Sequence, residues 1–507
     1  MAKRKKRKSV TLISLLLLLV ALIGVYYWYS NREAKPEDGN ENETESIQLA
    51  KIEDTSKLTS LHYRTKETEM TLVKDGEMWK LETEPERPIN QDKVSGLIGL
   101  ISDITAKRMV TEKADNPADF GLAEPTGYLQ GTLSDGTTVT LEIGTMVPSK
   151  DGYYANVNEG DKVYLLATNY GSGFNYTITN ITAVAEAPSI TADTIYHIAI
   201  DNRDRDDFEI VKDKNLGLGN IGSDVYPWHI LKPYKEGYSA ESTKVSTVQE
   251  NYTGLTYETC VEYNATDLSL YGLDNPLAIL DLGYTEERTE KLSKPEKDPE
   301  TGKEITEKTY QEPKEYKLLI GNQDETGSYY YVMEAGTKVV YTMEEEMVNK
   351  MLTVDPFSVL NSFINIPHIN TVDQIDITVD GKAYQFKIDH KKGTDEDGKE
   401  TVENTIFFNG KQANEAGFTD LYQVLIGAKY DAEIKEEVNA GVAPYLTIKY
   451  QLNDPAKTVI SASYLPYDQS FYLIDTNDEI KFFADKRRID DIVKKIEEYD
   501  PTVEPEE

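Results

Sequence analysis

The strongest constraint on the fold is a Gly-Leu-x-x-Pro signature that occurs twice in this 507-residue chain, at Gly121 and at Gly272. After each signature come an Ile-Gly pair, consecutive tyrosines and a Val-Tyr pair, in the same order. In both copies ten residues separate the Gly of the Ile-Gly pair from the last tyrosine of the run, and ten more reach the Tyr of the Val-Tyr pair. A repeat on this scale indicates that one domain type recurs along the chain.

The halves upstream of the signature align as well. A tryptophan lies 42 residues before the signature Gly in the first copy and 44 in the second, and a Lys-Val-Ser triplet follows each tryptophan. Glycine accepts the positive φ that a helix-to-strand connection requires, and proline fixes the entry of the next strand. We therefore interpret the motif as structural, with ligand binding as the alternative. Its positions are Trp79, Gly121, Leu122, Pro125, Gly144 and Tyr154, then Trp228, Gly272, Leu273, Pro276, Gly321 and Tyr331.

A third, degenerate copy fits the C-terminal part of the chain. Gly441 to Pro444 occupies the signature position with one residue fewer, and Phe471-Tyr472 precedes Phe482 by the same ten-residue step. Phe407-Phe408 takes the place of the tryptophan. Repeats of roughly 130–170 residues are long enough to bury their own cores.

The whole chain is therefore predicted to have seven segments. They are a basic segment at 1–8, a membrane anchor at 9–30, an acidic linker at 31–50, three repeats at 51–190, 191–366 and 367–499, and an acidic tail at 500–507.

Hydrophobic periodicity within a copy predicts an α+β fold. Residues 58–81 alternate as strands do, with a hairpin turn at Lys74 to Glu77, and apolar residues between Val94 and Ile104 follow helical spacing. Four short strands with tight turns are predicted over residues 128–166. We expect each copy to be an antiparallel β-meander with one or two covering helices. A charged insertion at 285–315 in the second copy has the composition of a solvated loop.

The N-terminal sequence predicts that the protein is anchored in a membrane. Six basic residues, Lys3 to Lys8, precede an apolar run from Val10 to Tyr29 that is long enough to cross a bilayer and ends in an aromatic cluster. The positive-inside rule then places the bulk of the chain outside the cell. A cleaved signal peptide is the alternative, but no Ala-x-Ala site follows; the only cysteine, Cys260, is too distant for a lipoprotein signal. We expect an uncleaved signal anchor that contacts the lipid bilayer through residues 10–29.

Composition excludes several classes of partner. The formal net charge is −35, which repels nucleic acid and anionic lipid and favours cations or basic partners; solubility alone is the simpler explanation. A single cysteine permits no intramolecular disulfide, so the cores must supply the stability.

Catalytic and metal-binding patterns are missing from the sequence. No two of the five histidines lie at a metal-ligand spacing, and Cys260 is interpreted as a buried structural thiol. A Gly-x-Gly-x-x-Gly at Gly217 to Gly222 is followed by strand-like residues and not by a helix, so we interpret it as a long turn. The acidic stretches at Asp201 to Asp207 and Asp395 to Gly398 lack the ligand pattern of a calcium loop. We predict no enzyme, no cofactor and no metal.

Tyrosine is abundant, at 34 residues. Consecutive tyrosines, as at Tyr153-Tyr154, point to opposite faces of a strand, so one ring is expected to pack inward while the other can meet a partner or a sugar ring.

The order of these motifs resembles the bacterial domain-of-unknown-function family numbered 4340. The residues that carry the resemblance are Trp79-Lys80-Leu81, Lys93-Val94-Ser95, Gly121 to Pro125, Ile143-Gly144 and Tyr153-Tyr154. Members of that family are often encoded beside an ABC-type transport system related to gliding motility. The resemblance therefore implies an accessory role at an exporter, and it carries over no catalytic residue.

Two functional hypotheses follow. The first is a membrane-anchored, extracytoplasmic, non-enzymatic adaptor of an ABC-transporter-linked envelope complex, in which repeated modules raise avidity. The alternative is a cell-wall or glycan-binding protein that uses exposed tyrosines.

Overall fold

The computed structural model describes residues 46–212, 227–235, 237–297, 302–395, 398–439, 441–476 and 478–502. The predicted anchor and the Gly217 to Gly222 turn lie outside these residues. The described chain divides into two compact units: one takes 46–58, 63–66 and 97–174, and the other takes 59–62, 67–96 and the residues from 175 onward. No helix among the described residues is long and apolar enough to cross a membrane.

The structure is mostly antiparallel β-sheet, with few helices. The first large sheet has the strand order β4-β3-β2-β7-β8-β9-β10-β6. Its strands are β2 (Leu58–Thr65), β3 (Glu69–Asp75), β4 (Met78–Leu81), β6 (Arg108–Thr111), β7 (Gly127–Leu133), β8 (Thr138–Met146), β9 (Tyr153–Val157) and β10 (Val163–Leu166). A separate two-stranded sheet pairs β1 (Ile47–Lys51) with β5 (Asp103–Ala106).

The second large sheet has the order β14-β13-β12-β11-β16-β17-β18-β19-β15. Its strands are β11 (Ile195–Asn202), β12 (Phe208–Lys212), β13 (Trp228–Lys232), β14 (Tyr238–Ala240), β15 (Thr259–Glu262), β16 (Ala278–Lys297), β17 (Glu304–Gln323), β18 (Tyr329–Glu334) and β19 (Val340–Glu344).

The third large sheet has the order β23-β22-β21-β20-β25-β26-β27-β28-β24. Its strands are β20 (Val372–Val379), β21 (Lys382–Thr394), β22 (Glu400–Phe408), β23 (Lys411–Gln412), β24 (Ala432–Glu433), β25 (Leu446–Leu452), β26 (Val459–Pro466), β27 (Phe471–Thr476) and β28 (Glu479–Asp485). Numbered along the chain, the second and third sheets have the same strand order; the first has that order without the outermost strand beside β4.

Helices supply part of each core. They are α2 (Gln91–Ser102), α3 (Thr168–Ser172), α4 (Ile178–Ile181), α5 (Ser242–Gln249), α6 (Glu345–Leu352), α7 (Pro356–Val359), α8 (Glu415–Ile426) and α9 (Lys486–Glu497). The Lys-Val-Ser triplets lie in α2 and α5. Val94 and Val245 are fully buried, while the ammonium of Lys93 donates to the carbonyl of Asn180 and that of Lys244 to the carbonyl of Leu360. The triplet therefore anchors its helix both to the core and to a later segment of the chain.

Helix α2 ends earlier than its periodicity suggests. The apolar pattern runs to Ile104, but the helix stops at Ser102 and Ile104 lies in β5, opposite Ala50. Because Ile104 is buried either way, hydrophobic spacing alone does not separate the last helical turn from the first strand residue.

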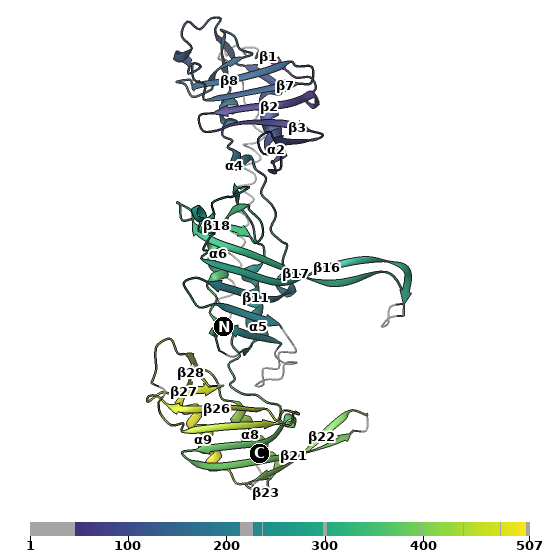
Figure 1. Ribbon diagram of the computed structural model, residues 1–507, viewed down its shortest axis with the longest axis vertical. Helices are drawn as coiled ribbons and strands as arrows, with labels where there is room; N and C mark the ends of the chain where they lie inside the picture. The colour runs from purple at the N-terminus through teal and green to yellow at the C-terminus, as the bar shows by residue number, and fades with distance from the viewer. Residues whose placement is uncertain are drawn as a thin grey trace, which may run out of the picture. The chain divides into compact units, whose positions relative to one another are not determined.

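The expectation of a loop at 285–315 is wrong. Strands β16 and β17 continue through it as a two-stranded ribbon that leaves the second sheet (Figure 1). The antiparallel register pairs Glu290 with Lys308 and Lys291 with Glu307, so opposite charges face each other across the strands. With both faces solvated, a strand needs no apolar alternation, which is why composition alone indicated a loop. We call residues 285–315 the arm.

Candidate functional site

Each signature Gly ends a single turn of 3-10 helix. Gly121 (φ 71°) follows the turn Pro117–Phe120, and Gly272 (φ 67°) follows Leu268–Tyr271. This is the left-handed conformation expected for glycine. The next residue donates its backbone N–H to the first carbonyl of the turn, from Leu122 to Pro117 and from Leu273 to Leu268, each at 3.0 Å.

The Gly of the Ile-Gly pair accommodates that turn. A Cβ on Gly144 would lie 2.1 Å from the carbonyl oxygen of Phe120, and a Cβ on Gly321 would lie 2.1 Å from that of Tyr271. In both sheets the strand pairing shifts register just after the Ile of the pair. The two glycines of each copy therefore belong to one close approach between the turn and the strand.

The signature tyrosines complete the same contact. Tyr154 packs edge-on against Phe120 with ring centroids 5.2 Å apart, and Tyr331 packs edge-on against Tyr271 at 5.1 Å. The remaining positions lie elsewhere. Trp79 is in β4, and Trp228, in β13, is separated from β17 by three strands. The prolines precede β7 and β16 by two residues, at strand entry as expected. The glycines, leucines and tyrosines of the signature thus gather at one turn per copy, and its tryptophans do not.

Few tyrosine rings are exposed enough for a sugar to stack on them. Tyr153, Tyr154 and Tyr329 to Tyr331 are all half-buried, so no member of either run is as exposed as the expected outward ring. Among the described tyrosines, only Tyr310, on the arm, and Tyr467 expose more than 40 % of their surface.

Cys260 matches its prediction. It is buried in β15, and burial raises the pKa of its thiol to about 11. Such a thiol is chemically unreactive at neutral pH.

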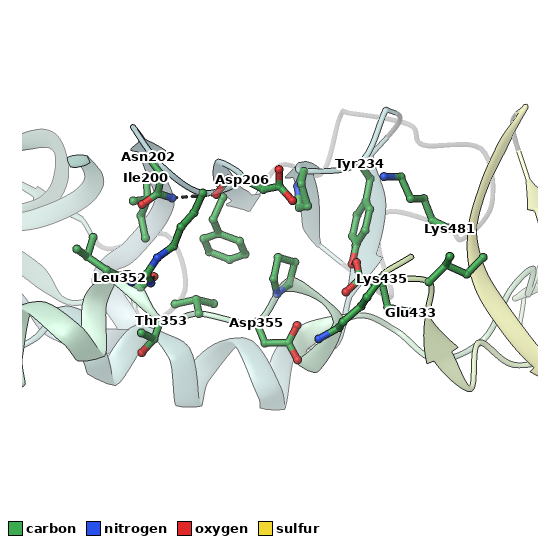
Figure 2. Close-up of a pocket in the computed structure, with 16 residues that line it drawn as sticks. Ile200, Asn202, Asp206, Tyr234, Leu352, Thr353, Asp355, Glu433, Lys435 and Lys481 are labelled. Atoms are coloured by element: carbon green, nitrogen blue, oxygen red, sulfur yellow. Dashed lines mark hydrogen bonds between the residues drawn. The ribbon is translucent and has the colours of Figure 1, made fainter. Parts of the chain in front are cut away.

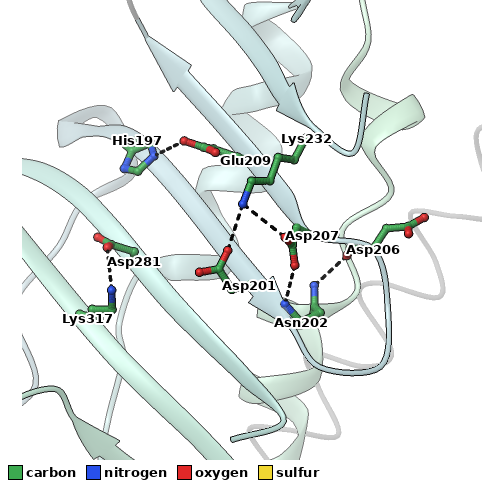
Figure 3. Close-up of polar contacts among 9 residues, drawn as sticks. All are labelled: His197, Asp201, Asn202, Asp206, Asp207, Glu209, Lys232, Asp281 and Lys317. Atoms are coloured by element: carbon green, nitrogen blue, oxygen red, sulfur yellow. Dashed lines mark hydrogen bonds and ion pairs between the residues drawn. The ribbon is translucent and has the colours of Figure 1, made fainter. Parts of the chain in front are cut away.

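The acidic stretch at 201–207 is organised by a lysine. The ammonium of Lys232 lies 3.2 Å from the carboxylate of Asp201 and 3.3 Å from that of Asp207 (Figure 3). The same sheet carries a hydrogen bond between His197 and Glu209 and an ion pair between Asp281 and Lys317. Within the described part of the chain, no group of three or more His, Cys, Asp or Glu is arranged to hold a metal.

A cavity of about 680 Å³ lies within the second compact unit, and no sequence pattern indicated it. Figure 2 shows Tyr234, Glu433, Lys435 and Lys481 at one end, Asn202 and Thr353 toward the other, and Asp355 between them. We call this the charged cavity. Its lining residues are Ile200, Asn202, Arg205, Asp206, Phe208, Pro233, Tyr234, Leu352 to Pro356, Glu433 to Lys435 and Lys481.

The electrostatics of the charged cavity centre on Glu433. The phenol of Tyr234 donates to its carboxylate at 3.1 Å. Burial raises the pKa of Glu433, and the charge of Asp355 raises it further, whereas Lys435 and Lys481 act in the opposite direction. Burial also raises the pKa of Tyr234, so that phenol stays a donor at neutral pH.

A buried contact fixes the walls of the cavity to each other. The carboxylate of Glu479, 9 % exposed, accepts hydrogen bonds from the backbone N–H of Lys235 at 3.1 Å and from the phenol of Tyr238 at 3.3 Å. Around it, the ring of Phe482 packs against those of Tyr234 and Tyr238, at 5.3 and 5.4 Å. Tyr234 and Tyr238 belong to the second sheet region and Phe482 to the third. Sequence patterns could not reveal this site, because its residues are brought together only by tertiary packing.

Comparison with known proteins identifies the family. The model described as "Domain of unknown function (DUF4340)" matches residues 79–276 and again residues 228–425, so each match begins at one of the two signature tryptophans. The chain belongs to this family and carries its domain more than once. No curated protein and no solved structure matches the chain.

Proposed function

We propose that the chain is a membrane-anchored, extracytoplasmic adaptor built from three copies of one module, and that it serves an ABC-transporter-linked envelope complex. The three-copy organisation is supported by the shared strand order of the three large sheets and by the two family matches. The anchor at residues 10–29 rests on the sequence pattern alone.

The arm is the observation that carries this proposal. Residues 286–291 and 306–311 are exposed on both strands, so this part of the hairpin adds nothing to the core of its module. The equivalent hairpin of copy one, β7–β8, closes instead with a short turn around Gly136. Two-stranded ribbons are at best marginally stable in water. A long ribbon kept in one copy and not in another is suited to contacting a partner.

The arm also has suitable dimensions and charge. About 12 residues per strand at about 3.3 Å each extend roughly 40 Å. Over its described residues, acidic and basic side chains are nearly balanced, whereas the whole chain carries −35. A partner approaching the arm therefore meets less repulsion than one approaching the rest of the surface.

Site-specific photo-crosslinking in the native cells tests this proposal. A photoreactive phenylalanine replaces Tyr310 on the arm, and a matched variant carries it at Tyr467, which has similar exposure on the third sheet region. We expect transporter subunits, identified by mass spectrometry, to crosslink from position 310 and not from position 467. Equal labelling from both positions, or recovery of abundant membrane proteins alone, would contradict an adaptor arm.

The glycan-binding alternative predicts a different outcome. It depends on exposed aromatic rings, of which Tyr310 and Tyr467 are the ones the described surface offers. If wall polymer is captured from both positions and transporter subunits from neither, the alternative replaces the adaptor.

A further inference from the structure

We propose that the charged cavity binds a small zwitterionic molecule, which carries both an ammonium and a carboxylate group and has the size of an amino acid or a short peptide. A volume of about 680 Å³ falls within the usual range for small-molecule sites. This proposal does not depend on the adaptor function.

The charges of the lining are balanced in number. Arg205, Lys435 and Lys481 contribute three positive groups, and three carboxylates, Asp206, Asp355 and Glu433, oppose them. Both signs occur together toward one end, where Glu433 lies with the two lysines (Figure 2). A ligand with a single charge would meet repulsion from half of these groups, whereas a zwitterion can pair with both kinds.

The interior of the cavity offers apolar contacts in addition to charged groups. Ile200 and Phe208 form apolar lining and are almost fully buried. Glu433 is half-buried, and its raised pKa reflects a carboxylate whose lost hydration is not fully replaced. A ligand ammonium placed beside this carboxylate would compensate for the lost hydration. Arg205 is held near the opposite wall by a 3.5 Å contact with the carbonyl of Leu352, which leaves its remaining donors for a carboxylate.

The cavity is largely preformed. Its walls come from residues 200–356 on one side and 433–481 on the other, and the contact of Glu479 with Lys235 and Tyr238 joins the two. Binding therefore does not have to assemble the site, which lowers its entropic cost.

Calorimetric titration of the full-length protein in detergent tests the proposal. The probes are triglycine, N-acetyl-triglycine, which lacks the ammonium, and triglycine amide, which lacks the carboxylate. We expect triglycine to bind at least about tenfold more tightly than either analogue and to weaken as salt is added. Absence of saturable binding by triglycine, or an analogue binding equally well, would overturn the proposal.

Variants assign the binding to the cavity. Glu433→Gln keeps an acceptor for Tyr234 and should weaken triglycine binding about tenfold, as should Lys481→Gln. Glu437→Gln removes an exposed carboxylate outside the lining and serves as the matched control. Hydrogen exchange across residues 428–434 establishes that each variant is folded. If folded Glu433→Gln and Lys481→Gln bind triglycine as the control does, the binding lies elsewhere and the assignment is wrong.

Discussion

Gly144 and Phe120 are in backbone contact so close that a Cβ on Gly144 would lie 2.1 Å from the carbonyl oxygen of Phe120. Gly321 and Tyr271 repeat this relationship at the same distance. The Ile-Gly glycine is therefore the position that lets a 3-10 turn pack onto a strand, although 23 residues separate Gly121 from Gly144 and 49 separate Gly272 from Gly321.

Substitution of either strand glycine should destabilise one copy only. Gly144→Ala forces the turn away from β8, and we expect a loss of about 3 kcal/mol. Hydrogen exchange with mass spectrometry should show faster exchange in β7–β9 for Gly144→Ala and in β16–β18 for Gly321→Ala. Gly99→Ala is the control: it lies on the exposed face of α2 with nothing within 4 Å of the added Cβ, and it should stabilise by about 0.5–1 kcal/mol. Unchanged exchange in both strand variants would show that the contact is not required.

Shortening the arm should leave the stability of its module nearly unchanged. In the variant, residues 287–311 are replaced by the Ser-Asp-Gly turn that closes the copy-one hairpin. Because most of the described residues removed are exposed and none is buried, the unfolding free energy should change by no more than about 0.5 kcal/mol. Leu280→Ala, at a fully buried position of the same strand, should cost about 2–5 kcal/mol. Urea unfolding measures both, and a large loss on shortening would make the arm a structural element.

Cys260 should react slowly with thiol reagents while the protein is folded. With its pKa at about 11, only about one thiol in a thousand is ionised at pH 8. Labelling by iodoacetamide should be at least about 100-fold slower than in urea and should accelerate about tenfold for each pH unit between 8 and 10. The raised pKa also means that folding stability falls as the pH rises through 9 toward 11, since the unfolded chain ionises first. Fast labelling at pH 7 would contradict a buried thiol.

Tyr238→Phe should loosen the contact that joins the cavity walls. The substitution removes the phenol that donates to Glu479 and leaves a buried carboxylate with fewer donors, at a cost of about 1–3 kcal/mol. Tyr467→Phe, at an exposed ring, is the control and should have almost no effect. Hydrogen exchange should rise at residues 428–434 and 479–484 in Tyr238→Phe only. Unaltered exchange there would indicate that the walls are held by aromatic packing alone.

Periodicity predicted the parts of this fold that short-range physics specifies. The strands within 58–81 and 128–166, the helix that contains Val94, the left-handed Gly121 and the buried Cys260 are found as expected. The misjudged features are of a different kind. In the arm, Glu290 and Lys308 form a strand pair because they face each other across a ribbon, and the end of α2 before Ile104 is set by pairing of that residue with Ala50.

The sequence by itself determined the repeated α+β module, since Gly, Pro and alternating apolar residues act on neighbours a few positions away. The sequence also located the signature positions, and the two family matches begin at the signature tryptophans Trp79 and Trp228. Only the tertiary structure decided where Tyr234 meets Glu433 and where Glu479 is buried, because these partners lie about 200 residues or more apart. No local pattern records such a contact. It arises when packed sheets bring polar groups out of water and each must find its partner in another part of the chain.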